Sequence, residues 1–148
     1  ADPSILPDPP FDRAGRDGAR TPMQWDSTAT AGFTTGTPWL PMPPEWSSRT
    51  VEVQQRDPAS SLALYRAALA ARREHDPLRT GSFAWRESAP GTLVFAREGD
   101  DATIVCAVNV SADEVELPGG ELMLASAPEV RGALPTNTAA WLREERRG

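Results

Sequence analysis

Two closely spaced arginines, Arg16 and Arg20, are the side chains whose type and spacing best suit recognition of a polar ligand. A carboxylate, Asp17, lies between them, and Pro22 follows, which disfavours helix at the residue before it. A planar guanidinium makes forked hydrogen bonds to carboxylates or to neighbouring hydroxyls, and an arginine paired with an aspartate keeps its geometry. The spacing therefore predicts a loop with fixed cations, whereas composition alone favours a solvated turn.

The arginines belong to a longer pattern that holds rare residue types in a fixed order. It reads Arg-Asp-Gly-Ala-Arg-Thr-Pro-Met-Gln-Trp-Asp over residues 16–26, then Gly-Phe-Thr over 32–34 and Pro-Trp-Leu over 38–40. This pattern resembles the signature late in the catalytic barrel of alpha-glucosidases, in the oligo-1,6-glucosidase and alpha-glucosidase branch of the alpha-amylase superfamily (glycoside hydrolase family 13). The resemblance covers nearly the whole chain, although residues 111–148 match by strand pattern more than by motif.

The resemblance implies a role for one arginine of the motif in binding sugar. In the family, such an arginine lines the pocket for the non-reducing glucose and pairs with an aspartate from an early barrel loop. Arg20, next to Thr21, is the expected pocket residue. Arg16 is the second candidate, and with Asp17 it is more suited to bracing the loop. A cation aimed at hydroxyls in a partly dry pocket binds a sugar, so the expected substrate is an alpha-glucoside oligosaccharide.

The carboxylates that perform hydrolysis are expected to lie outside this sequence. Retaining glycosidases hold a nucleophile and an acid/base about 5 Å apart across the scissile bond. In the family both of them, and a third stabilising aspartate, stand on barrel strands before the arginine motif, and no motif for any of them occurs here. We therefore predict no catalytic residue among the early carboxylates, which are Asp17, Asp26, Glu45 and Glu52.

Other reactive side chains give weaker predictions. His75 stands beside Asp76 without the clustered ligands that a metal needs, so neither metal nor cofactor is expected. Cys106 lies in an apolar run and is predicted to be an inert core thiol. Asn109 opens a formal Asn-Val-Ser glycosylation acceptor, which we interpret as a strand end. Structural anchoring is favoured over sugar stacking for the tryptophans of the first half, Trp25, Trp39 and Trp46.

Composition and charge argue against several classes of partner. The 148 residues carry 15 basic and 21 acidic side chains, a net charge of −6. Nucleic acids and anionic membranes need clustered basic residues, so neither is expected as a partner. No run reaches the roughly 18 apolar residues of a membrane span, and one cysteine allows no intrachain disulfide. We expect a cytoplasmic protein, and the start inside a proline-rich loop predicts a fragment whose N-terminal barrel is missing.

Loops and one helix must position the arginine motif. Residues 1–14 and 27–50 contain many prolines and no periodicity, which predicts long irregular loops. Asp57 is a plausible N-cap with Pro58 at the first helical position, and the helix should end before Pro77. It resembles the eighth and last helix of the barrel in this family, so its wide apolar stripe would face a barrel. The stripe has three- to four-residue spacing: Leu62, Tyr65, Leu69 and Arg72.

From residue 78 onward, short apolar runs alternate with turns about every ten residues, which predicts a small antiparallel β-sandwich. Residues 92–97 and 103–110 should form a hairpin, and the second strand should be central because both of its faces are apolar. Trp85 and Trp141 are expected to be buried. Further strands are predicted at 83–85, 114–117, 121–125 and 139–142.

The expected fold class is thus an α+β fragment with two domains. Residues 1–77 would form the end of a (β/α)8 barrel, a long loop plus the last helix. Residues 78–148 would form a small antiparallel β-sandwich, the C-terminal all-β domain.

The expected function is that of a C-terminal fragment of a retaining alpha-glucosidase, which hydrolyses alpha-glucosidic bonds of short oligosaccharides such as maltose, isomaltose or sucrose. The fragment alone should be inactive, because the nucleophile and the acid are missing. Two alternatives stay open: a fragment of a related transglucosidase or isomerase, such as a sucrose isomerase or trehalose synthase, and a non-catalytic carbohydrate-binding β module. Trp85 and Trp141 lying flat and adjacent on the surface would favour the binding module, but a purely structural role is the expectation for residues 78–148.

Overall fold

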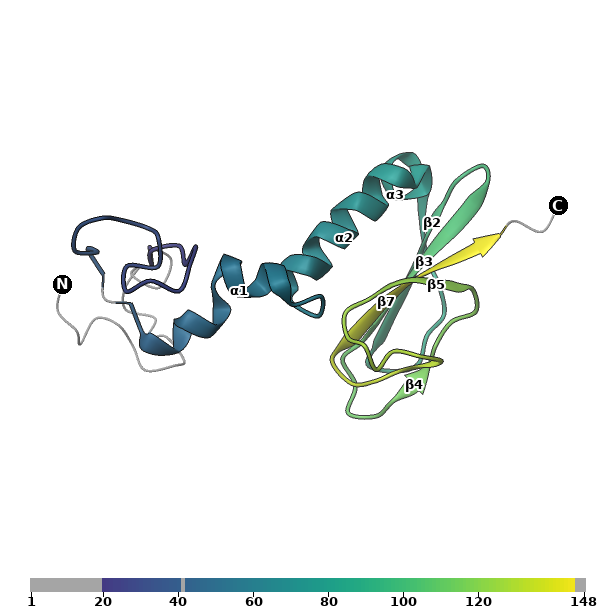
Figure 1. Ribbon diagram of the computed structural model, residues 1–148. Helices are drawn as coiled ribbons and strands as arrows, with labels where there is room; N and C mark the ends of the chain where they lie inside the picture. Colours follow the sequence, from purple (N-terminus) through teal and green to yellow (C-terminus); the bar gives the residue numbers. More distant parts are fainter. Residues whose placement is uncertain (1–19, 41, 146–148) are drawn as a thin grey trace. The chain divides into compact units, whose positions relative to one another are not determined.

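The computed structural model describes residues 20–40 and 42–145 (Figure 1). The chain divides into two compact units, Ala1–Leu62 and Ala63–Gly148. The first holds the arginine motif and two short helices, and the second holds the β-strands. Arg16 and Asp17 lie outside the described residues. The domain boundary predicted between residues 77 and 78 stays a prediction.

Two short helical elements follow the loop of the first unit: the 3-10 helix η3 (Pro44–Arg49) and α1 (Val51–Arg56). A proline suits the first position of η3 because its missing N–H would have no partner there. Thr50 caps α1, since its Oγ1 accepts a hydrogen bond from Val53 N at 3.2 Å. The irregular loop predicted over residues 27–50 is therefore wrong for its last residues, which form η3.

The main helix, α2 (Ser61–Glu74), begins later than predicted. Asp57 does not cap it, because Asp57 Oδ1 accepts from Ala59 N at 2.9 Å and the Asp57 carbonyl accepts from Ser60 N at 3.1 Å, which closes a turn. Gln54 takes the capping role, with its Oε1 accepting from Leu62 N at 3.2 Å. The end of α2 before Pro77 is confirmed, and the short helix α3 (Asp76–Thr80) follows.

Two antiparallel sheets make up the β part of the described chain. The larger has five strands in the order β1-β2-β3-β7-β5, and the smaller pairs β4 with β6 (Figure 1). The predicted hairpin is confirmed as β2–β3, and β3 is central between β2 and β7. Sequence reasoning missed the two-residue strand β6. The strands are β1 (Ser82–Trp85), β2 (Thr92–Glu98), β3 (Ala102–Asn109), β4 (Val115–Glu116), β5 (Glu121–Ala125), β6 (Ala133–Leu134) and β7 (Thr138–Glu145).

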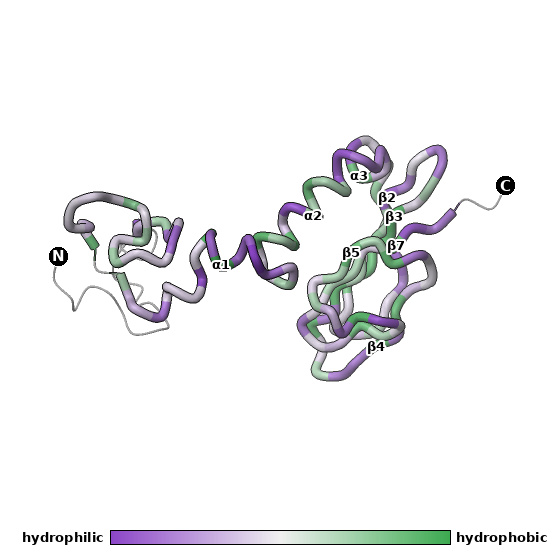
Figure 2. The backbone as a smooth tube through the Cα atoms, in the orientation of Figure 1, coloured by the Kyte–Doolittle hydropathy of each residue, from purple (hydrophilic) through white to green (hydrophobic). Residues whose placement is uncertain are grey.

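The core of the second unit lies on one face of the larger sheet. Side chains alternate between the faces of a strand, so Val94 and Ala96 of β2 point to the same side and are 8% and 0% exposed. Hydrophobic residues gather on the central strands in Figure 2. The buried cluster also takes residues from the connections and from β6, and it consists of Val94, Val105, Ala107, Val130, Leu134, Ala140 and Leu142.

On the opposite face of the sheet, the structure contradicts the predicted burial of the tryptophans. Trp85 was expected to be buried, yet it is 64% exposed. It lies on the edge strand β1, paired with Phe95, and the alternation of that strand turns Ala84 rather than Trp85 toward the core. Trp141 on β7 is only half-buried, so the prediction of two buried tryptophans is wrong.

Asn109 ends β3, as predicted from the acceptor motif. The residue is 0% exposed, and its Nδ2 donates to the carbonyls of Asp113 and Leu134, each at 2.8 Å. Its Oδ1 accepts from Ser111 N at 2.9 Å and from Ser111 Oγ at 2.7 Å. The amide nitrogen that a glycan would need is thus buried and fully used inside the folded chain.

Candidate functional site

The loop that follows Arg20 is fixed to the N-terminus of α1 through its backbone. Val51 N donates to the Gln24 carbonyl at 2.9 Å, and Glu52 N donates to the Trp25 carbonyl at 3.0 Å. The first N–H groups of a helix have no partner within the helix, so an extended segment that offers carbonyls satisfies them. The motif segment is therefore positioned by α1 and not by a strand of the described chain.

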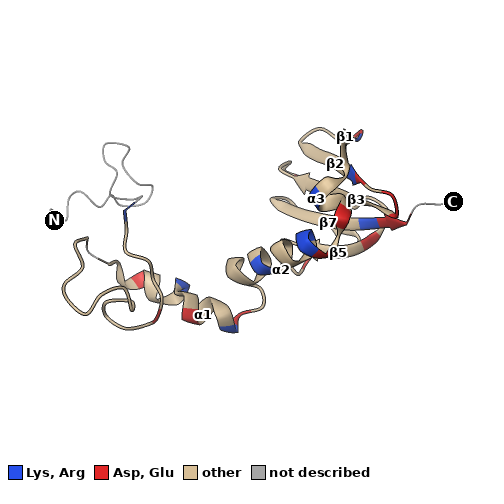
Figure 3. Cartoon of the chain, turned by 90° about the horizontal axis from the view of Figure 1, so that it is seen from above, with Lys and Arg blue, Asp and Glu red and all other residues tan. Residues whose placement is uncertain are grey.

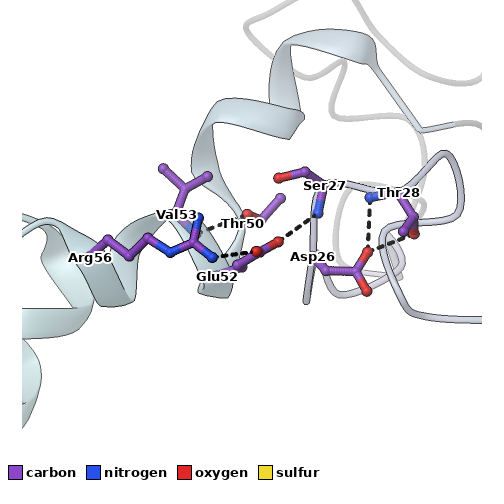
Figure 4. A network of polar contacts seen from close by, with 7 residues as sticks. All are labelled: Asp26, Ser27, Thr28, Thr50, Glu52, Val53 and Arg56. Carbon is purple, nitrogen blue, oxygen red and sulfur yellow. Dashed lines mark hydrogen bonds and ion pairs between the residues drawn. The ribbon is translucent and has the colours of Figure 1, made fainter.

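A tight turn over residues 25–32 shapes the next part of the loop. Trp25 N donates to the Ala31 carbonyl at 2.8 Å, and Ala31 N donates to the Thr28 carbonyl at 2.8 Å. Asp26 Oδ1 accepts from Thr28 Oγ1 at 2.6 Å and from Thr28 N at 2.9 Å (Figure 4). These two bonds stabilise the carboxylate and hold the pKa of Asp26 below its ordinary value, the hydroxyl contributing most.

Gly32 closes this turn in a conformation that requires glycine. Its φ is +64°, and a Cβ built on it would lie 2.5 Å from Asp26 Oδ2. A side chain at this position would push against the same carboxylate that organises the turn. The glycine of the Gly-Phe-Thr part of the motif thus has a structural reason.

A second carboxylate, Glu52, joins the turn to α1. Its Oε2 accepts from Ser27 N at 3.3 Å, and its Oε1 pairs with Arg56 Nη2 at 2.7 Å. Figure 4 shows the chain of contacts from Arg56 through Glu52 to the Asp26 turn. Asp26 and Glu52, the two early carboxylates in this network, are thus engaged in holding the loop. That the early carboxylates have no catalytic role stays a prediction.

Arg20 lies over the indole of Trp39, with its Cζ 5.9 Å from the ring centroid. Trp39 is 61% exposed, so the pair is at the surface of the first unit. A guanidinium over an exposed indole gains about 0.5–1 kcal/mol. The structure thus brings Arg20 together with a second residue of the motif, while the other candidate, Arg16, is outside the described residues.

A cavity of about 370 Å³ lies beside this loop. Asp26 lines it, but Asp26 is held by Thr28, so the cavity does not offer the free carboxylate pair that glycoside hydrolysis requires. Gln24 Nε2 donates to the Pro22 carbonyl at 2.8 Å, which fixes this side chain in the wall of the cavity. The polar and aromatic lining of the cavity includes Gln24, Asp26, Thr28, Trp46, Ser47 and Thr50.

The described residues offer neither a metal-ligand cluster nor a membrane-spanning helix. In residues 20–40 and 42–145, no group of three or more His, Cys, Asp or Glu side chains could hold a metal ion. Over the same residues, no helix has the length and apolar character needed to cross a bilayer. Cys106 is 8% exposed, and burial raises the pKa of its thiol, with a smaller opposing effect from Trp141.

Comparisons with known proteins decide the family. Residues 7–81 match the model of the alpha-amylase catalytic domain. The chain belongs to the alpha-amylase family. It corresponds to the end of the catalytic barrel followed by an antiparallel β domain, as predicted.

Relatives of the alpha-amylase family resemble the chain over most of its length. A probable alpha-glucosidase of Rhizobium meliloti is 40% identical over 109 residues, 72% of this chain and 20% of that relative. A probable oligo-1,6-glucosidase 2 of Bacillus subtilis is 39% identical over 100 residues, 67% of this chain and 18% of that relative. The crystal structure of an alpha-glucosyl transfer enzyme, XgtA, is 38% identical, with a TM-score of 0.71 over 93% of this chain and 27% of that one. The chain thus spans about a fifth of the length of the curated relatives that it matches.

The site could be read from the sequence only in part. The motif led to Arg20, but its contact with Trp39 was not foreseen, because nothing in the spacing of the two residues places them together. The turn over residues 25–32 was also missed. Its signal was present as an aspartate followed two residues later by threonine, with a glycine at the turn's end.

Proposed function

We propose that this chain is the C-terminal part of a retaining alpha-glucosidase that hydrolyses alpha-glucosidic bonds of short oligosaccharides. The observation that carries the proposal is the match of residues 7–81 to the alpha-amylase catalytic domain, together with relatives named alpha-glucosidase and oligo-1,6-glucosidase. Residues 1–77 complete the barrel with a loop and the last helix, and residues 78–148 form a supporting β domain.

Within this enzyme, Arg20 contacts hydroxyls of the non-reducing glucose, and Arg16 is the second candidate for the same role. The support for Arg20 is its position in the motif and its contact with Trp39. The guanidinium carbon of Arg20 lies 5.9 Å from the centroid of the Trp39 ring. The loop beneath it is fixed by the Val51 and Glu52 N–H groups. A cation that is held in place before the sugar arrives binds hydroxyls with less loss of entropy.

The chain alone is inactive in this proposal, because the nucleophile and the acid/base stand on barrel strands outside it. Asp26 in the loop is held by Thr28, and Glu52 in α1 is held by Ser27 and Arg56. The proposed compartment is the cytoplasm, which suits a free, buried Cys106 thiol.

The test compares arginine variants in the polypeptide that includes the barrel, with a chromogenic alpha-glucoside as substrate. Arg20→Ala should lower kcat/KM by about 100-fold or more, since a buried acidic partner is left unpaired. Arg20→Lys should recover only part of the loss, because lysine lacks the fork.

Two further variants complete this test. Arg79→Ala is the matched control, an exposed arginine of α3 that pairs with Asp76, and it should be neutral. Arg16→Ala run in parallel assigns the role: unchanged kinetics for Arg20→Ala with a large loss for Arg16→Ala moves the contact to Arg16. Neutrality of both variants contradicts the proposed site.

Glucosyl transfer is the second candidate reaction. The 38% identity to an alpha-glucosyl transfer enzyme favours it. Product analysis of the complete enzyme on maltose separates the two reactions: glucose alone indicates hydrolysis, and longer or isomeric saccharides indicate transfer.

A further inference from the structure

Glu52 ties the loop after the arginine motif to α1 through both its backbone and its side chain. Its backbone N–H donates to the Trp25 carbonyl at 3.0 Å, and its Oε2 accepts from Ser27 N at 3.3 Å. Its Oε1 pairs with Arg56 Nη2 at 2.7 Å, one helical turn later (Figure 4). Ser27, Glu52 and Arg56 are called the Glu52 network below.

The bond from Ser27 is one that the turn over residues 25–32 does not make by itself. The next N–H, of Thr28, donates at 2.9 Å to Asp26 Oδ1 inside the turn. Ser27 N instead donates to a side chain 25 residues further along the chain. The backbone bonds between the loop and α1 survive any substitution of Glu52 except proline. The carboxylate therefore supplies the part of the attachment that a substitution can remove.

Arg56 orients this carboxylate. The two residues lie four apart, so their side chains meet on one face of α1, and Figure 3 shows acidic and basic positions along this helix. A carboxylate with one oxygen held by a guanidinium keeps its other oxygen in a fixed direction, here toward Ser27 N. The Glu52 and Arg56 side chains are 39% and 75% exposed. Dissolved salt therefore screens the pair.

The loop that the Glu52 network holds leads directly into the arginine motif. The Gln24 carbonyl accepts from Val51 N at 2.9 Å, and Gln24 is four residues after Arg20. Between the two, the Pro22 carbonyl accepts from Gln24 Nε2 at 2.8 Å, which stiffens the connection. A shift of the loop is thus passed on toward the motif. Misplacing a binding group by about 1 Å can cost up to about 100-fold in rate.

We propose that Glu52 is a positioning residue for glucose binding, and that its pair with Arg56 makes the affinity for an uncharged sugar depend on ionic strength. Glu52 acts through the loop, on the motif arginine that contacts the glucose. This inference rests on the proposed function, and it holds whether Arg20 or Arg16 makes that contact. Because the sugar is neutral, screening has no direct charge–charge attraction between sugar and enzyme to weaken.

Steady-state kinetics on maltose test the inference in the polypeptide that includes the barrel. Glu52→Ala should raise KM about 3- to 10-fold with kcat nearly unchanged, because the sugar must then order the loop in the ground state and the transition state alike. Glu52→Gln keeps an acceptor for Ser27 N but loses the ion pair, so its KM should lie between the two. Arg56→Ala should resemble Glu52→Gln. An unchanged KM in Glu52→Ala overturns the inference.

The salt dependence of KM is a readout that a merely structural role would not move. Raising NaCl from about 0.05 to about 0.5 M shortens the screening length to about 4 Å. The KM of the unsubstituted enzyme should then rise about 1.5- to 3-fold. Arg56→Ala should abolish this rise. A KM that does not respond to salt, or an equal rise in Arg56→Ala, overturns the inference.

Melting temperatures and a matched control separate lost affinity from lost folding. Glu52→Ala should lower the melting temperature by no more than about 2 °C, since the pair is exposed. A merely structural residue would lower kcat with the folded fraction and leave KM as it was, which would contradict the inference. Asp76→Ala is the control, because Asp76 is an exposed carboxylate that pairs with Arg79 three residues later. It should change neither KM nor its salt dependence, and a rise as large as that of Glu52→Ala overturns the inference.

Hydrogen exchange keeps the inference separable from the proposed function. In Glu52→Ala, Ser27 N loses its acceptor, so the peptide that covers residues 24–32 should exchange about 2- to 10-fold faster, while peptides of β3 keep their rates. An active enzyme in which Glu52→Ala changes neither loop exchange nor KM refutes the positioning alone. A polypeptide that turns over no alpha-glucoside, yet shows the faster loop exchange in Glu52→Ala, refutes the proposed function alone.

Discussion

Replacing Asn109 by alanine should destabilise the β domain more than any other single truncation of a polar side chain in β3. The side chain makes two hydrogen bonds as donor, to the Asp113 and Leu134 carbonyls, and two as acceptor, from Ser111. Asp113 O keeps a partner in Ser111 Oγ at 2.8 Å, whereas the bond to the Leu134 carbonyl is a buried one. The loss of these four hydrogen bonds at a fully buried side chain should lower the unfolding free energy by about 3 kcal/mol, with a range of about 2–5.

Urea unfolding followed by far-UV circular dichroism measures this loss in the unfolding free energy. Asn109→Asp keeps the bonds from Ser111 but loses both donors and brings a carboxylate against two carbonyls, so it should be at least as unstable as Asn109→Ala. Ser111→Ala is the control and should cost about 1 kcal/mol. A loss under about 0.5 kcal/mol for Asn109→Ala, or a larger one for Ser111→Ala, refutes the reasoning.

Three other predictions concern separate parts of the chain. Arg86 and Glu144 form a two-pronged ion pair at 2.8 and 2.9 Å, and a double-mutant cycle should give a coupling of about 0.5–1 kcal/mol that falls with salt; zero coupling at low salt contradicts it. Gly32→Ala should lower the unfolding free energy of the first unit by more than about 1 kcal/mol, because Gly32 has a positive φ and a Cβ there would meet Asp26; an unchanged unfolding free energy contradicts this reasoning. Burial raises the pKa of Cys106, so the folded chain holds its proton longer and the unfolding free energy should fall as pH rises past the thiol's ordinary pKa; a Cys106→Ala variant should lose this slope, and an unchanged slope refutes the assignment.

The β domain could be predicted well because its signals are local. Alternating burial in β2, a continuous apolar run in β3 and the turn residues between them define the two strands, and their pairing across a three-residue turn follows directly. The exposure of Trp85 could not be predicted, because large apolar residues are usually buried and the sequence does not say which face of an edge strand meets the core. The helix start was missed because Asp57 and Pro58 suit both a cap and a turn. A side chain from the preceding helix, Gln54, then caps α2 instead.

The candidate site followed from the motif and not from physical patterning. Composition alone would leave Arg20 as a surface cation, and its place over Trp39 depends on the path of the whole intervening loop. That path is set by Gly32 and by the N-terminus of α1, neither of which signals a ligand in the sequence. The residues that hold this loop in shape are therefore recognised from the structure and not from the sequence.

The most direct test of the central claim is turnover of a chromogenic alpha-glucoside by two samples measured side by side. One is this chain of 148 residues, and the other is the polypeptide that carries the same residues behind its barrel. We predict turnover in the second and none above background in the first. Turnover by the isolated chain, or no turnover by a folded complete polypeptide with any alpha-glucoside, would contradict the account.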